Sequence, residues 1–349
     1  MWRYFSNDRE DIMMRKGRFT RIAIGTMLTV LVSFAVTVNI SNAGEKPKFI
    51  KVAGSSLAGT WFRISAMSAA ILNQKIKGTI FSATLGGGLT NIKRIESGQL
   101  EMGLAMTSGL GFARYGTGPF KGSKKKNVAV IGVMYKNPYH LVVRKNSPIQ
   151  SAGDLAGKQI AVGKSGWSTE LYARTLLEAY DLNYKKIKSA GGKIHFVGWG
   201  PMTRLFKDKR IDAAFYATAI PVPQLLDITT VHPIRVLGID NAKRGWFKKN
   251  YPAYFEMPIP KGAYKGHDKG VITMGDSVTM TIQKNIDPDL GYQITKTLFE
   301  NTKVLAKVHK KLKGMTPEKA LAGVKMPLHR GAARYFKEKG ISIPAEIMP

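Results

Sequence analysis

Five short segments rich in glycine, serine and threonine carry the residues best suited to chemistry in this sequence. They cover residues 54–60, 85–91, 107–109, 163–169 and 217–219. Where such a segment leads into a helix, it offers backbone N–H groups, hydroxyl donors and the positive end of the helix dipole. This combination suits a carboxylate or another small anion. Glycine and serine are also ordinary turn residues, so a single segment would mean little.

The candidate binding residues lie in these segments or, for Trp61, directly after one, and we expect them to gather at one sheet edge and form a cleft. They are Ser55, Ser56, Thr60, Trp61, Gly87, Gly88, Thr90, Thr107, Ser108, Ser165, Gly166, Trp167, Ser168, Thr169 and Thr218. Trp61 is most simply the first packed residue of a helix. Trp167 stands among small polar residues, where its indole either covers a ligand or packs as a loop side chain.

Most other chemistry lacks the residues that it needs. The absence of cysteine excludes disulfides, thiolate zinc sites, iron–sulfur clusters and cysteine nucleophiles. None of the six histidines stands at a metal-binding spacing, and no Gly-x-Ser-x-Gly motif occurs. Gly163-Lys164-Ser165 resembles the end of a P-loop, but Lys158 stands where that loop needs glycine. We therefore expect no catalytic activity, no metal and no cofactor.

The elements that must position these segments alternate between strands and helices, which predicts an α/β fold with a largely parallel sheet. The apolar patterns predict strands at 49–53, 79–83, 102–106, 128–134, 140–144, 159–162, 194–197 and 213–216. They predict helices at 61–74, 90–97, 169–180, 202–207, 290–310, 317–322 and 329–339.

The same alternation, occurring twice, predicts a molecule with two lobes. We expect the first lobe to comprise residues 44–136 together with the returning segment 276–349, and the second lobe to comprise residues 137–275. Residues 128–144 should lead out of the first lobe, and residues 278–283 should lead back into it.

The N-terminus has the pattern of a secretory signal peptide. Basic residues are followed by an uncharged apolar run at 22–38 and by Ser41-Asn42-Ala43, which predicts cleavage after Ala43 and a periplasmic product. The alternative is an uncleaved anchor, although the run is shorter than the roughly 20 residues that span a bilayer. Met13 and Met14 compete with Met1 as the start of translation.

The chain is strongly basic, with 54 Lys+Arg against 23 Asp+Glu and a formal net charge of +31. This balance attracts anions. The lysine clusters, at 124–126, 185–186, 248–249 and 310–311, are scattered along the sequence. They indicate a solvated surface and not the focused patch that nucleic-acid binding requires.

Several motifs together resemble the extracytoplasmic solute receptors of TRAP transporters, of the TAXI type, over residues 48–341. The matching pieces are Gly59-Thr60-Trp61, Gly86-Gly87, and the segments 116–120, 154–163, 169–170, 294–301 and 327–332. The resemblance implies a type II periplasmic-binding-protein fold with a hinged cleft between two lobes. It also implies a receptor, expected to be monomeric, that delivers a small carboxylate to membrane subunits driven by an ion gradient.

The sequence departs from that family at positions that bear on the ligand. Met106 and Ser108 stand where the family commonly has Gln and Asp, and Arg63 stands where relatives often have Pro. Without a carboxylate at position 108, a ligand ammonium group would lose a partner. We therefore expect a keto acid or dicarboxylate to bind more tightly than its amino-acid counterpart. Arg63 is either a further partner for a carboxylate or an exposed helix residue.

Two other functions remain compatible with the sequence. The chain could be a ligand-sensing adaptor for a membrane signalling partner, or a surface adhesin for anionic polymers. A neighbouring permease or sensor-kinase gene would discriminate the transport receptor from the adaptor. An adhesin should bind heparin-like chains in a strongly salt-dependent way.

Overall fold

The structure is a computed structural model and describes residues 47–57 and 59–349. The predicted signal peptide and its cleavage site lie outside these residues. Within the described part of the chain, no helix combines the length and apolar character needed to cross a membrane.

A first group of strands forms one half of a mixed sheet. β1 (Phe49–Ala53) lies between β2 (Ile80–Thr84) and β3 (Met102–Met106), and all three run parallel. Each is followed by a helix: α1 (Thr60–Lys75), α2 (Gly88–Glu96) and α3 (Thr107–Tyr115). Every residue of β3 is buried, as expected for a strand covered on both faces. We call these elements, with the C-terminal helices below, the first lobe.

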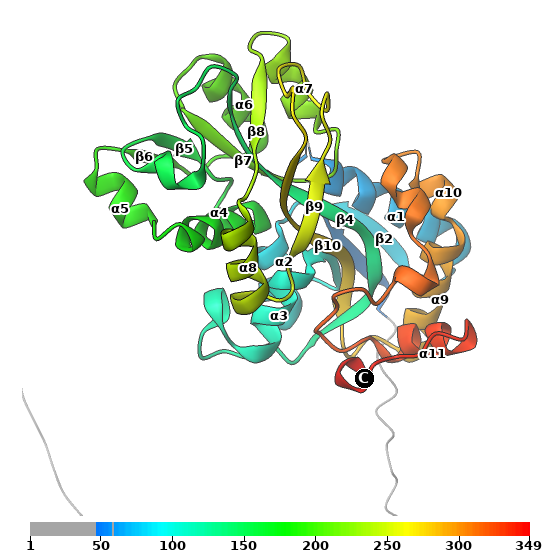
Figure 1. Ribbon diagram of the computed structural model, residues 1–349. Coiled ribbons are helices and arrows are strands. Elements are labelled where there is room, and N and C mark those ends of the chain that lie inside the picture. Colours follow the sequence, from blue (N-terminus) through cyan, green and yellow to red (C-terminus); the bar gives the residue numbers. More distant parts are fainter. Residues whose placement is uncertain (1–46, 58) are drawn as a thin grey trace, which may run out of the picture. The chain divides into compact units, whose positions relative to one another are not determined.

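A second group of strands repeats the plan. β5 (Gln159–Ala161) lies between β6 (Lys193–His195) and β7 (Ala213–Ala217) in parallel. The accompanying elements are α4 (Ser168–Ala179), α5 (Tyr184–Ser189), α6 (Trp199–Lys207), α7 (Pro223–Thr229), β8 (Ile234–Leu237) and α8 (Asn241–Asn250). We call this group the second lobe; Figure 1 shows it mainly in green.

Two long strands join the lobes. β4 (Val128–Arg144) and β10 (Val271–Gln283) run antiparallel to each other from Val128↔Gln283 to Pro138↔Gly275. From Tyr139 onward β4 pairs instead with β7, while the first part of β10 pairs with β9 (Phe255–Ile259). Figure 1 shows both strands passing between the two groups. The mixed α/β class predicted from the sequence is therefore confirmed.

Several predicted elements differ from the structure. Residues 128–134 and 140–144 belong to one strand, because Pro138, which has no N–H to donate, lies where β4 changes its pairing partner. Residues 107–109 begin α3 instead of forming a loop. The helix expected at 290–310 is divided into α9 (Pro288–Glu300) and α10 (Thr302–Leu305), since Asn301 leaves the helical conformation. Residues 317–319 form only a short 3₁₀ turn.

The C-terminal segment completes the first lobe. α11 (Arg330–Glu338) packs on α9, and α1 contacts both α9 and α10. Figure 1 shows α1, α9, α10 and α11 on the side of the molecule away from the second lobe. Leu328 forms an isolated bridge with Val130 of β4, which ties the last part of the chain to the joining strand.

Candidate functional site

Four helices begin around one small region between the lobes. α1 and α2 come from the first lobe, and α4 and α6 come from the second. The residues that precede them are Gly59, Gly87, Trp167 and Gly198, and none of these caps its helix with a side chain. The N-terminal N–H groups are therefore left for other acceptors, and all four helices present their positive ends.

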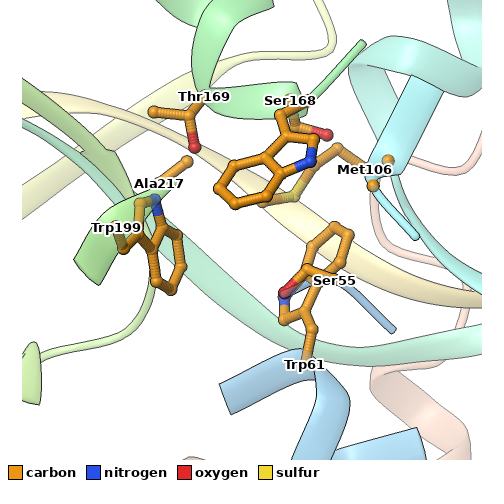
Figure 2. Close-up of a pocket in the computed structure, with 10 residues that line it drawn as sticks. Ser55, Trp61, Met106, Ser168, Thr169, Trp199 and Ala217 are labelled. Atoms are coloured by element: carbon orange, nitrogen blue, oxygen red, sulfur yellow. The ribbon is translucent and has the colours of Figure 1, made fainter. Parts of the chain in front are cut away.

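A cavity of about 20 Å³ lies among these helix starts, and we call it the tryptophan cavity. Its lining residues are Ser55, Trp61, Gly87, Gly88, Met106, Trp167, Ser168, Thr169, Trp199 and Ala217. Figure 2 shows Trp61, Trp199, Ser55 and Ser168 arranged around one space. The volume is close to the 10–15 Å³ minimum for a single water molecule, so the lobes are pressed together here.

The polar groups of this cavity are mostly donors without acceptors. Ser55 Oγ, Ser168 Oγ and Trp199 Nε1 are buried and make no hydrogen bond. Trp61 Nε1 forms no aligned hydrogen bond either. It lies near the Tyr135 hydroxyl, where it partly offsets the increase in the pKa of that hydroxyl caused by burial. A ligand that supplies several acceptor atoms would satisfy groups that are otherwise costly to bury.

No acidic residue lines the cavity. The first turns of α1, α2 and α6 contain no Asp or Glu. Glu170 lies in the first turn of α4, but its carboxylate is engaged by Arg174 at 2.8 Å and by the Tyr184 hydroxyl at 3.0 Å. The electrostatic balance of this region therefore favours an anion. Among the residues that the structure describes, no cluster of His, Asp and Glu could hold a metal ion.

The two lobes touch directly at the cavity. The carbonyl oxygen of Gly166 accepts hydrogen bonds from the N–H groups of Leu89 and Thr90, at 3.0 and 3.2 Å. A carbonyl group of the second lobe is thus hydrogen-bonded to backbone N–H groups at the N-terminus of α2. A Cβ atom added at Gly87 would stand 2.3 Å from Trp167 Cδ1, and one at Gly88 would stand 2.0 Å from Ser168 Oγ. Only glycine allows this close approach.

Trp167 is 7% exposed and meets Trp199 edge-to-face, with ring centroids 6.0 Å apart. Both indoles belong to the apolar core of the second lobe. Trp199 was not among the predicted site residues, because α6 begins three residues before the apolar pattern indicates. Ala217 and Met106, at the ends of β7 and β3, were also missed as lining residues; their position at strand ends was the available signal.

Asn91 ties two loops of the first lobe to β3 and was not predicted as a functional residue. Its amide donates to the carbonyls of Gly54 and Leu104, at 3.0 and 2.9 Å, and its Oδ1 accepts from the N–H of Gly87 at 3.1 Å. The side chain is fully buried on the apolar face of α2. A polar residue at an apolar helix position was the sequence signal.

Seven of the predicted site residues line the tryptophan cavity: Ser55, Trp61, Gly87, Gly88, Trp167, Ser168 and Thr169. The others lie outside its lining: Ser56, Thr60, Thr90, Thr107, Ser108, Ser165, Gly166 and Thr218. Of these, Thr90 and Gly166 contribute to the contact between the lobes, and Ser165 is exposed. Arg63 is exposed as well and does not line the cavity, so it behaves as a surface helix residue.

Ser108 faces a different region, which changes the argument about ligand charge. Its N–H and the hydroxyls of Thr107 and Tyr139 donate to the carboxylate of Asp276 on β10. Asp276 is fully buried, and burial raises the pKa of its carboxyl. A carboxyl group is thus present beside Ser108 after all, but neither residue lines the tryptophan cavity. The expected preference for keto acids and dicarboxylates over amino acids must therefore rest on the residues that line the tryptophan cavity, and not on Ser108.

Comparisons with known proteins give a family match and several distant structural likenesses. The sequence model of the NMT1-like family matches residues 52–340. The periplasmic aliphatic sulphonate binding protein SsuA from Escherichia coli is 14% identical, with a TM-score of 0.46 and 84% of each chain covered. The alkanesulfonate-binding protein SsuA from Xanthomonas axonopodis pv. citri, bound to MOPS, is 14% identical with a TM-score of 0.46; 84% of this chain and 92% of that one are covered.

A putative L-cystine ABC transporter from Listeria monocytogenes is also 14% identical, with a TM-score of 0.47; 76% of this chain and 96% of that chain are covered. These values describe a distant likeness in fold, from which we infer no ligand.

Proposed function

The chain belongs to the NMT1-like family, and from that premise we propose that it is an exported, non-enzymatic receptor that captures a small organic anion. The meeting of four helix N-termini at one cavity carries this proposal. Unpartnered donors and the lack of acidic lining residues add to it. Such a site stabilises negative charge through backbone and hydroxyl donors. The surplus of basic residues would speed the encounter with an anion.

Capture proceeds by separation and closure of the lobes about β4 and β10. The change of pairing partner at Pro138 and Tyr139 supports lobe boundaries at 44–136, 137–275 and 276–349. With the lobes apart, the donors of α2 lose the Gly166 carbonyl and can bind a carboxylate oxygen of the ligand. Closure then brings α4 and α6 onto the same anion and stops short of the direct lobe contact described above, because the tryptophan cavity in that contact has room for about one water molecule.

The receptor delivers its ligand to the membrane subunits of a TRAP transporter. The TAXI-type motifs of the sequence support this partner, and the N-terminal pattern supports periplasmic localisation with cleavage after Ala43. The protein acts as a monomer and does not bind nucleic acid. Intact-mass measurement of the exported product tests the processing. A product that retains residues 22–38 in the membrane fraction would contradict a free receptor.

The kind of ligand is tested by calorimetry with 2-oxoglutarate and glutamate on the purified protein. No carboxylate lines the tryptophan cavity, so an ammonium group would lose its hydration without gaining a charged partner. A charge-assisted hydrogen bond contributes about 1.5–3 kcal/mol, which corresponds to roughly tenfold to hundredfold in affinity. We expect 2-oxoglutarate to bind more tightly by that factor. Tighter binding of glutamate would refute this preference.

Matched tryptophan variants connect the binding to the cavity. Trp199→Phe removes the unpartnered Nε1 donor and keeps an aromatic ring, so the affinity for the bound carboxylate should fall at least tenfold. Trp246→Phe removes an indole that does not line the cavity, and it should leave the affinity unchanged. Equal effects of the two substitutions would place the anion elsewhere. Failure of every carboxylate tested to bind the folded protein would overturn the proposed function.

A further inference from the structure

A second and larger cavity, of about 490 Å³, lies between the lobes, and we call it the aromatic cavity. One wall belongs to α3 of the first lobe and includes Ser108, Phe112 and Tyr115. The opposite wall is the segment after α8 in the second lobe and includes Tyr251 and Tyr254. Its volume lies within the roughly 300–1,000 Å³ typical of small-molecule pockets.

The walls of the aromatic cavity combine rings with a few hydrogen-bonding groups. Four aromatic side chains line it, and the hydroxyls of Ser108 and Tyr254 are buried; they lie near each other but form no aligned hydrogen bond. Each of these two residues is only 3% exposed. Among the lining residues only Lys325 is charged, and its ammonium group is paired with Glu346 at 2.8 Å. The lining therefore offers stacking surfaces and two neutral hydroxyls. The Asp276 carboxyl lies behind Ser108 and already accepts from Thr107, Ser108 and Tyr139, and burial raises its pKa toward the neutral form.

We propose that the aromatic cavity is a second binding site, which takes an uncharged ring-bearing molecule with a hydroxyl or carbonyl group. The ring packs among Phe112, Tyr115 and Tyr251, and the polar group pairs with the hydroxyls of Ser108 and Tyr254. This site is separate from the tryptophan cavity, since the two share no lining residue. The inference does not depend on the identity of the anion bound there.

The second-lobe wall is held rigidly, as a preorganised site requires. Tyr254 packs against Tyr139 and Phe247, with ring centroids 5.7 and 5.5 Å away. Tyr139 in turn stacks on Tyr172 at 3.9 Å. Phe112 and Tyr251 meet edge-to-face between the lobes, at 5.6 Å. A molecule in this cavity contacts both lobes and would therefore favour their closed arrangement.

Ligand-observed ¹⁹F NMR with 4-fluorobenzyl alcohol on the purified full chain tests the site. Gly111 lines the cavity, and a Cβ added there meets only Lys325 Cβ, at 4.0 Å. Gly111→Leu should therefore project into the cavity beside the rings and weaken probe binding at least tenfold. Because the residue lies within α3, leucine should not lower helix stability. The control, Gly245→Leu, changes an exposed glycine in α8 and should leave binding unchanged.

Ser108→Ala provides a second variant that removes one hydroxyl and keeps the backbone contact with Asp276. It should weaken the binding of 4-fluorobenzyl alcohol several-fold and leave the weaker binding of 4-fluorotoluene, which has no hydroxyl, unchanged. 4-Fluorobenzylamine has the same size but is charged, and it should bind more weakly than the alcohol. Absence of probe binding to the wild type, binding that Gly111→Leu does not affect, or preference for the amine would overturn the proposal.

Discussion

Gly87→Ala should force the lobes apart without disturbing either lobe. Gly87 has φ 176°, an extended conformation that alanine adopts freely, so the substitution adds no backbone strain. Its N–H remains available to Asn91. The added methyl would stand 2.3 Å from Cδ1 and 2.8 Å from Nε1 of Trp167, which belongs to the other lobe. The buried indole is packed against Trp199 and has little room to move.

The size of the effect follows from this contact. Carbon atoms in van der Waals contact are about 3.5–4.0 Å apart, so the lobes must separate by more than about 1 Å. Overpacking of this kind costs about 1–3 kcal/mol. Because only the closed arrangement bears this cost, the ratio of closed to open molecules should fall by roughly 5- to 150-fold.

Tryptophan fluorescence with acrylamide quenching reports on the change, because Trp61, Trp167 and Trp199 all line the cavity at the contact. Gly87→Ala should increase quenching, and small-angle X-ray scattering should give a larger radius of gyration than for the wild type. Gly245→Ala, at a helical position with no atom within 4 Å of the added Cβ, is the control. Quenching and scattering equal to those of the wild type would refute the lobe contact described here.

Three further substitutions test other parts of the structure. Asn91→Ala should lower the free energy of unfolding by about 3 kcal/mol in chemical denaturation, because it leaves buried loop groups unpaired, whereas the exposed Asn250→Ala should change it little. Trp167→Phe should remove most of the fluorescence change that carboxylate addition causes; an unaltered change would assign the signal to another tryptophan. Burial lowers the pKa of His140 to about 3, so the unfolded chain binds more protons between pH 6.5 and 3. Stability should fall as the pH drops through that range, by up to about 1.4 kcal/mol per unit, and His140→Gln should have a shallower pH dependence in thermal unfolding. An identical slope would contradict the buried neutral histidine.

The sequence predicted the local parts of the fold well, because strand and helix patterns depend on neighbouring residues. The strands at 49–53 and 102–106 have the predicted bounds. Features set by distant contacts could not be predicted in this way. A proline usually excludes a position from the interior of a strand, but Pro138 lies within β4, where that strand changes its pairing partner from β10 to β7.

The candidate site was predictable to the same degree. Glycine-rich strand ends identified most of the cavity, because parallel strands bring their carboxyl ends to one edge. Trp199 and Asn91 were missed, since their roles depend on residues far away in the sequence. Ser108 was correctly predicted to follow the end of β3. The orientation of α3, which no local sequence pattern indicates, makes it line the aromatic cavity instead of the tryptophan cavity.

The position of β10 affects the order in which the chain can fold during synthesis. β10 lies between β3 and β4 in the sheet, yet it is made after the whole second lobe. A nascent chain therefore contains β1 to β4 for a long time without the strand that joins β3 to β4. The second lobe, whose strands β5 to β8 are consecutive, can pair earlier. A first lobe that cannot close its sheet until residues 271–283 appear would stay unfolded until late in translation, which is compatible with the export proposed above.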